Sequence, residues 1–191
     1  MSLQLPMSAP VDVVNDGRAR MTYFPAFVAQ DRADRWFASL HAGVPWRAER
    51  RTMYEREVAV PRLLAHYPLD AADLPCALQE CAGLVAARLG TAFTDVGLNL
   101  YRDGRDSVAP HHDRTGALDP SAPIAIVSLG GTRTMLVGAI EPPRRTRRIA
   151  LEHGSLLVMD FASQRHWLHG VPKTARPVEP RISLAFRRHL A

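Results

Sequence analysis

Six short runs of β-branched and other apolar residues fill the second half of this chain, and they constrain its fold more than any other feature. The runs span residues 96–101, 124–129, 134–137, 148–151, 156–159 and 181–187. Turn-forming pairs punctuate them, among them Asp103-Gly104, Gly130-Gly131 and Pro142-Pro143. Many short strands joined by tight turns are typical of packed antiparallel sheets, and a jelly roll protects the edges of such sheets. We therefore predict a jelly-roll core for residues 91–191.

Two helices are expected ahead of these strands. The first covers residues 31–41, where one face carries Ala33, Trp36, Phe37 and Leu40. The second begins with Asp73 as its N-cap and stops at Gly90. Its apolar stripe comprises Leu74, Leu78, Cys81, Val85 and Leu89. Between the helices, residues 58–64 read as a short extended segment around Pro61. Helices that precede a run of strands pack on one side of the sheets, which predicts an α+β fold that is mainly β.

A single domain accounts for the length of 191 residues. We expect residues 1–20 to form a flexible N-terminal arm and residues 21–191 to form the domain, with its helical part at 21–90. No apolar run reaches the roughly 18 residues of a membrane helix, and residues 1–15 do not read as a secretory signal. Cys76 and Cys81 lie on different sides of the second helix, and reduced thiols suit the cytosol. The expectation is a cytoplasmic monomer without a membrane partner.

The chain carries 24 Lys and Arg against 19 Asp and Glu, which gives a net charge of +5. A basic balance favours polyanionic partners such as nucleic acid. Residues 142–148 read as a hairpin tip, and four arginines gather there, at positions 144, 145, 147 and 148. Such a cluster is either a grip for phosphate groups or a solvated loop, and the sequence leaves both interpretations open.

One cluster of residues has the spacing of a metal site. His111 and Asp113 follow a turn, and in a strand these two positions point to the same face, so that they can hold one ion. The candidates for a third ligand are His153, His166 and His169. Two imidazoles and one carboxylate leave three coordination positions open, which is the arrangement of non-haem Fe(II) oxygenases.

In the run at residues 181–187, one face carries only apolar side chains, and the other carries Arg181, Ser183, Ala185 and Arg187. Arg181 and Arg187 share a face with Ser183, and a dicarboxylate would satisfy two inward-facing guanidinium groups. Asn99 and Tyr101 alternate in the same way in another run, and both can donate hydrogen bonds to a carboxylate. The competing interpretation is an edge strand whose polar face lies in water.

Taken together and in order, these segments resemble the AlkB family of Fe(II)- and 2-oxoglutarate-dependent dioxygenases, which repair alkylated nucleic acid. The resemblance covers most of the chain and rests on residues 53–58, 61–63, 99–104, 111–113, 127–130, 154–159, 167–172 and 181–187. It implies a double-stranded β-helix fold, a type of jelly roll. It also implies that His111, Asp113 and His169 bind Fe(II), with 2-oxoglutarate and O₂ as co-substrates.

The resemblance implies a binding site for 2-oxoglutarate as well. Asn99, Tyr101 and Arg181 would hold the distal carboxylate, and Arg187 would lie near the metal-chelating end. Ser183 belongs to this group of cofactor-binding candidates, although many family members carry asparagine at its position.

The function implied is oxidative dealkylation of N-alkylated bases in DNA or RNA, in which 2-oxoglutarate decarboxylation is coupled to hydroxylation of the alkyl group and release of an aldehyde. The alternative is a hydroxylase or demethylase of the same type that acts on a protein, a lipid or a small molecule. A third hypothesis is a nucleic-acid-binding module without turnover, which the complete set of candidate ligands opposes.

Residues 21–90 would include the lid that covers a flipped nucleotide. The substrate-binding candidates are Tyr54, Arg62, His66, Tyr67, Thr115, Arg144 and Arg145. Thr115 departs from the repair members of the family, which usually carry an acidic residue there, so base preference is open. The stretch after Tyr67 is also short, which removes the place where some members carry a stacking aromatic residue.

Overall fold

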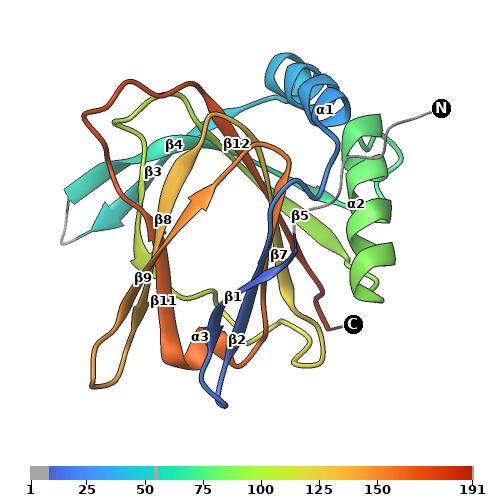
Figure 1. Ribbon diagram of the computed structural model, residues 1–191. Helices are drawn as coiled ribbons and strands as arrows, with labels where there is room; N and C mark the ends of the chain where they lie inside the picture. The colour runs from blue at the N-terminus through green and yellow to red at the C-terminus, as the bar shows by residue number, and fades with distance from the viewer. Residues whose placement is uncertain (1–8, 54–55, 191) are drawn as a thin grey trace.

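Two antiparallel sheets face each other in the computed structural model, which describes residues 9–53 and 56–190 (Figure 1). The larger sheet has the order β1-β2-β10-β7-β12-β5-β4-β3. Its strands are β1 Val11–Asn15, β2 Arg20–Phe24, β3 Arg47–Met53, β4 Arg56–Pro68, β5 Asp95–Tyr101, β7 Ile124–Gly130, β10 Ser155–Met159 and β12 Arg181–Arg187. The smaller sheet has the order β6-β11-β8-β9, with β6 Val108–His111, β8 Arg133–Ala139, β9 Thr146–Leu151 and β11 Trp167–Val171. The predicted pair of packed antiparallel sheets is confirmed.

Helices α1 (Gln30–Gly43) and α2 (Cys76–Leu89) cover the outer face of the larger sheet, as predicted (Figure 1). A third helix, α3, is a single turn at Ser163–His166. Apolar side chains of both long helices pack with those of the sheet in one continuous core. None of the described helices is long and apolar enough to cross a membrane.

Strand β12 contributes side chains to two hydrophobic cores, one on each face of the larger sheet. Leu184 and Phe186 point toward the helices and are fully buried. A second core lies between the two sheets and includes Ala185 of the same strand. Because β12 is hydrogen-bonded to β5 on one side and to β7 on the other, the competing interpretation of an exposed edge strand is wrong.

The predicted helix faces are largely correct. Ala33, Trp36 and Leu40 of α1 are buried, whereas Phe37 is half-buried and stacks on His41 with ring centroids 5.4 Å apart. The N-cap prediction at Asp73 is wrong, because α2 begins only after Pro75 and has no side-chain cap. Gly90 ends the helix in a left-handed conformation with φ of 62°, as glycine allows.

The prediction of a flexible arm is wrong for residues 11–20. Val11–Asn15 forms β1 and pairs with β2, which pairs in turn with β10. The turn between the two strands is closed by the Asp16 carboxylate, which accepts hydrogen bonds from the N–H groups of Arg18 and Ala19. The sequence Asn15-Asp16-Gly17 is a hairpin signal, and Gly17 adopts a positive φ of 80°.

Several strands are longer than the sequence pattern indicates. The segment expected at residues 58–64 is the strand β4, Arg56–Pro68, which pairs with β3 and β5. The hairpin tip expected at 142–148 is shorter, because β9 already begins at Thr146. The run at 181–187 matches β12 at both ends.

We predict that Gly130→Ala destabilises the fold. Gly130 ends β7 with φ of 85°, and an added Cβ would meet the Pro180 carbonyl oxygen and the Phe37 ring. Left-handed strain and overpacking together should lower the free energy of unfolding by about 2–4 kcal/mol, measured by urea denaturation. Gly138→Ala in β8 is the control, because a Cβ there meets no atom within 4 Å. Equal stabilities of the two variants would contradict the prediction.

Candidate metal centre and anion pocket

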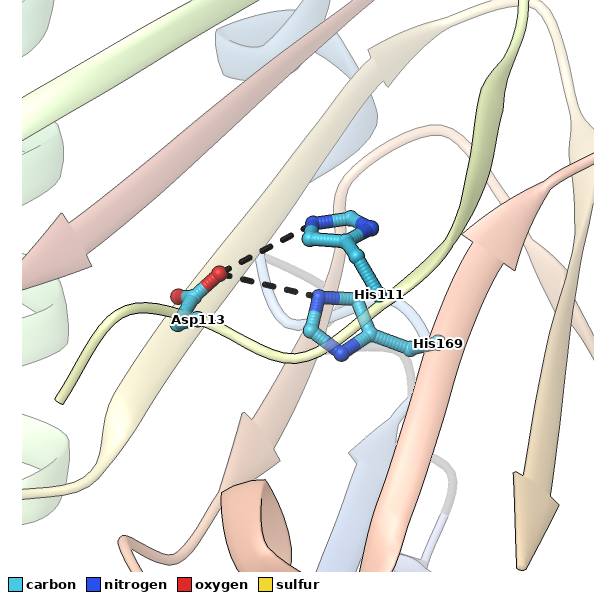
Figure 2. A group of neighbouring side chains, drawn as sticks. All are labelled: His111, Asp113 and His169. Carbon is cyan, nitrogen blue, oxygen red and sulfur yellow. Dashed lines mark ion pairs between the residues drawn. The ribbon is translucent and has the colours of Figure 1, made fainter. Parts of the chain in front are cut away.

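His111, Asp113 and His169 form a compact group in which the three potential ligand atoms lie within 4.8 Å of one another. His111 ends β6 and lies directly opposite His169 on the neighbouring strand β11. Figure 2 shows both imidazole rings turned toward the Asp113 carboxylate. Oδ1 of Asp113 is 3.8 Å from Nε2 of His111 and 3.9 Å from Nε2 of His169. Within the described residues, this is the only such group of His, Cys, Asp and Glu side chains.

The structure brings Asp113 to the group by a route other than the predicted one. We expected His111 and Asp113 to share one face of a strand, but β6 ends at His111 and Asp113 lies in the following loop. The other two candidates for a third ligand lie elsewhere. His153 accepts a hydrogen bond from the Gly130 N–H, and His166 belongs to α3.

The hydrogen bonding of His111 and the burial of His169 suit the binding of a metal cation. Nδ1 of His111 lies 2.9 Å from the Ala109 carbonyl oxygen, which can only accept a hydrogen bond, so this nitrogen carries a proton and Nε2 is the ring nitrogen that can bind a metal ion. Burial and the neighbouring His111 lower the pKa of His169 to about 4. His169 is therefore neutral at pH 7, which is the form that binds a metal ion.

Arg187 approaches the same group from the larger sheet. Its Nε and Nη2 atoms lie 2.9 Å and 2.8 Å from Oδ2 of Asp113. This two-point contact fixes one carboxylate oxygen and leaves Oδ1 facing the imidazoles. The predicted partnership of Arg187 with the metal end of the site therefore has a geometric basis.

Arg181 forms the second part of the site, an anion pocket. It is only 1% exposed, and its Nη2 donates a 2.8 Å hydrogen bond to Oγ of Ser128. Its Nε and Nη1 atoms are buried and have no hydrogen-bond partner among the described residues. Burial also lowers the pKa of the Arg181 guanidinium group. A buried cation with free N–H groups is costly without an anion, so this arrangement fits a carboxylate ligand.

The other predicted cofactor residues lie on the same inner face as Arg181. Tyr101 is directly opposite Arg181 in the strand register, and its ring centre is 5.2 Å from the guanidinium carbon. Ser183 lies opposite Asn99 and, on its other side, Ser128. Strands β5, β7 and β12 thus gather the polar side chains of three runs into one pocket wall.

Some of the predicted substrate residues line an open cleft of about 880 Å³ next to this wall. Its lining includes Arg62, His66 and Tyr67 as well as Asn99 and Arg187. Arg62 donates a 2.7 Å hydrogen bond from Nε to Oδ1 of Asn99. The cleft therefore connects the predicted lid with the pocket wall.

The remaining substrate candidates are more scattered. His66 is exposed and lies 3.2 Å from the buried Asp95 carboxylate, while Tyr67 also packs against the helix-side core. Thr115 is half-buried in the loop after Asp113. Arg144 and Arg145 are exposed at the β8–β9 hairpin tip, and Tyr54 lies outside the described residues.

Sequence reasoning missed three residues that support the site, Ser128, Arg133 and Gln164. Arg133 is 3% exposed and donates hydrogen bonds to the carbonyl oxygens of Asp103, Asp106 and Pro172, at 2.9, 2.9 and 2.7 Å. Gln164 accepts a 2.9 Å hydrogen bond from the Asp113 N–H. Only Ser128 leaves a clear signal, since it is a hydroxyl in the apolar strand β7.

Comparison with known proteins gives a consistent result. Residues 67–187 match the family described as the 2OG-Fe(II) oxygenase superfamily. The chain is 31% identical over 194 residues to human alpha-ketoglutarate-dependent dioxygenase alkB homolog 3. This match covers 90% of this chain and 66% of the human protein. It is 39% identical over 120 residues to mouse DNA oxidative demethylase ALKBH2, which covers 59% of this chain and 50% of the mouse protein. The matched region thus spans 66% of the first relative and 50% of the second.

Solved structures share the fold at low sequence identity. OsALKBH1 superposes with a TM-score of 0.63 and 16% identity, covering 92% of this chain and 99% of that one. A prolyl-4-hydroxylase from Pseudomonas putida also gives a TM-score of 0.63 and 16% identity, covering 90% of this chain and 93% of that one. These two likenesses concern the fold alone.

We predict that Asp113→Ala weakens divalent metal binding by at least about 100-fold, because two neutral imidazoles remain without the carboxylate that matches the charge of the ion. Isothermal titration calorimetry of the metal-free protein with Co(II) measures the affinity of each variant. His112→Ala is the control, since His112 is exposed and outside the group. Equal affinities for Asp113→Ala and the unmodified protein would contradict the assignment of Asp113 as a ligand.

Proposed function

Because this chain belongs to the 2OG-Fe(II) oxygenase superfamily, and within it to the AlkB family, we propose that it oxidatively removes alkyl groups from DNA or RNA bases. The proposal makes it an Fe(II)- and 2-oxoglutarate-dependent dioxygenase. His111, Asp113 and His169 would hold the Fe(II) ion, and their geometry and protonation fit that role.

The observation that carries the proposal is the combination of this group with the buried, incompletely paired Arg181. A three-residue metal group alone suits many enzymes. The inward-facing guanidinium of Arg181 on the facing sheet, whose Nε and Nη1 have no hydrogen-bond partner among the described residues, adds a receptor for a carboxylate. A ligand that carries one carboxylate for Arg181 and a chelating end for the metal has the chemistry of 2-oxoglutarate.

When bound, Fe(II), 2-oxoglutarate and O₂ supply the oxidant that hydroxylates a C–H bond while 2-oxoglutarate is converted to succinate and CO₂. The protein residues orient these partners. Ser128 and Tyr101 hold the Arg181 guanidinium in place, and Arg181 in turn binds the distal carboxylate. Arg187 balances the charge of Asp113. A hydroxylated N-alkyl group collapses to an aldehyde and the unmodified base, which completes dealkylation.

Nucleic acid as the substrate is supported by the names of the relatives and by the charge of the chain. One relative is called a DNA oxidative demethylase, and this chain carries a net charge of +5. Arg144 and Arg145 are exposed at the β8–β9 tip, where they can reach phosphate groups. The cleft beside Asn99 and Arg187 is large enough for a base taken out of its stack.

The assay that tests the function measures succinate and formaldehyde with Fe(II), ascorbate and 2-oxoglutarate. Oligonucleotides that carry N1-methyladenine or N3-methylcytosine are compared with the same strands unmethylated. We expect formaldehyde and additional succinate only with the methylated strands. Succinate without formaldehyde would refute nucleic-acid dealkylation and favour a protein, lipid or small-molecule substrate. Absence of both products would refute the enzyme itself.

We predict that Arg181→Met raises the KM for 2-oxoglutarate about 10- to 100-fold, because the charge-assisted hydrogen bonds to the distal carboxylate are lost while a side chain of similar length fills the space. Succinate release against 2-oxoglutarate concentration measures the change. Arg176→Met is the matched control on an exposed arginine ahead of β12. An unchanged KM with Arg181→Met would show that Arg181 has only a packing role.

A further inference from the structure

The backbone N–H of Asp113 has an unusual partner. Asp113 lies two residues beyond the end of β6, and it is 7% exposed. Its N–H donates to Oε1 of Gln164, a side chain on α3 that is itself only 2% exposed, at 2.9 Å. A buried backbone N–H without a partner is costly, so the Gln164 amide supplies the acceptor that a neighbouring strand would otherwise provide.

The neighbours of Gln164 determine which way its amide points. The Ser163 hydroxyl donates to the Asp160 carbonyl oxygen at 2.6 Å, so its oxygen is left as an acceptor. Nε2 of Gln164 donates to this oxygen at 3.1 Å. With the NH₂ group committed to Ser163, Oε1 must face Asp113, which agrees with the acceptor that the Asp113 N–H requires.

This chain of hydrogen bonds continues to the larger sheet. The Asp160 carboxylate accepts hydrogen bonds from the N–H of Ser163 at 2.7 Å and from the N–H of Arg20 at 2.7 Å. Arg20 is the first residue of β2. The position of the Asp113 main chain is therefore tied through α3 to the framework of the fold.

Asp113 is held at two points. Arg187 fixes Oδ2 of the carboxylate, while Gln164 fixes the main chain from which the carboxylate projects. With both contacts in place, Oδ1 faces Nε2 of His111 and of His169 at nearly equal distances of 3.8 and 3.9 Å. Loss of the Gln164 acceptor would leave the Asp113 N–H without this partner, while the contact of the carboxylate with Arg187 would remain.

We propose that Gln164 is a positioning residue for the metal ligand Asp113. It acts through the backbone of Asp113 and sets the direction in which Oδ1 meets the ion. The proposal rests on the proposed function for the identity of the ion as Fe(II). Outer contacts of this kind alter metal affinity by about 10- to 100-fold when they are removed.

The test measures Co(II) binding to the metal-free protein. Titration gives the affinity, and the visible absorption bands of Co(II) report its coordination. Gln164→Met removes the acceptor and keeps a side chain of similar length. We expect its Co(II) affinity to fall at least about tenfold and its absorption bands to change. Gln79→Met is the matched control, because Gln79 is exposed on α2. It should match the unmodified protein in both readouts.

Ser163→Ala provides a second variant that does not depend on the folding of Gln164→Met. It keeps the acceptor but removes the hydroxyl that orients the amide, so we expect a smaller loss of Co(II) affinity and a shifted absorption band. Thermal unfolding of the metal-free proteins confirms that each variant tested is folded.

The outcomes separate this proposal from the proposed function. If the unmodified protein binds Co(II), and Gln164→Met or Ser163→Ala binds it with the same affinity and spectrum, the role of Gln164 is overturned. The proposed function is not affected by that result. Unmodified protein that binds no Co(II) would overturn the metal centre and the proposed function with it. Weaker Co(II) binding and altered absorption bands in Gln164→Met and Ser163→Ala, but not in Gln79→Met, would support the proposal.

Discussion

The central place of β12 in the larger sheet is the constraint on which the site depends. β12 pairs with β5 over its whole length and with β7 from Arg181 to Phe186, so its register cannot change without disrupting both neighbours. A shift by one residue would turn Arg181 and Arg187 into the helix-side core and Leu184 into the pocket. Burial of Ile182, Leu184 and Phe186 against the helices opposes that shift. The apolar face of the strand thereby fixes the position of the charges on its other face.

Two buried arginines differ in the hydrogen-bond partners that the protein gives their guanidinium groups. Arg133 directs its guanidinium at three carbonyl oxygens, which ties the loop before β6 to the end of β11. Arg181 donates a hydrogen bond to Ser128, and its Nε and Nη1 atoms have no hydrogen-bond partner in the part of the chain that the structure describes. Arg133 is therefore satisfied by folding alone, whereas Arg181 is satisfied only with an anion bound. A site of this kind makes the ligand-free protein less stable and favours the bound state.

The sequence predicts the sheet more completely than the site. Alternation defines β12 from Arg181 to Arg187, because one face is entirely apolar and the other carries all three polar side chains. Spacing leaves three histidines as possible third ligands, and only the resemblance selects His169, since β6 and β11 meet through the fold. Arg133 and Gln164 escape prediction because their acceptors or donors are backbone groups, which leave no side-chain pattern. The β1–β2 hairpin escapes because its turn signal lies among polar residues near the N-terminus.

The two halves of the site belong to different sheets. His111 and His169 are carried by the smaller sheet, whereas Arg181 and Tyr101 are carried by the larger one. The space available to a ligand that spans them is therefore set by the thickness of the layer of side chains between the sheets, which includes Val137, Trp167 and Leu157. Substitutions in that layer change the separation of the two sheets, and natural variation in these apolar residues is a route by which ligand size and selectivity can evolve while every polar group in the site stays the same.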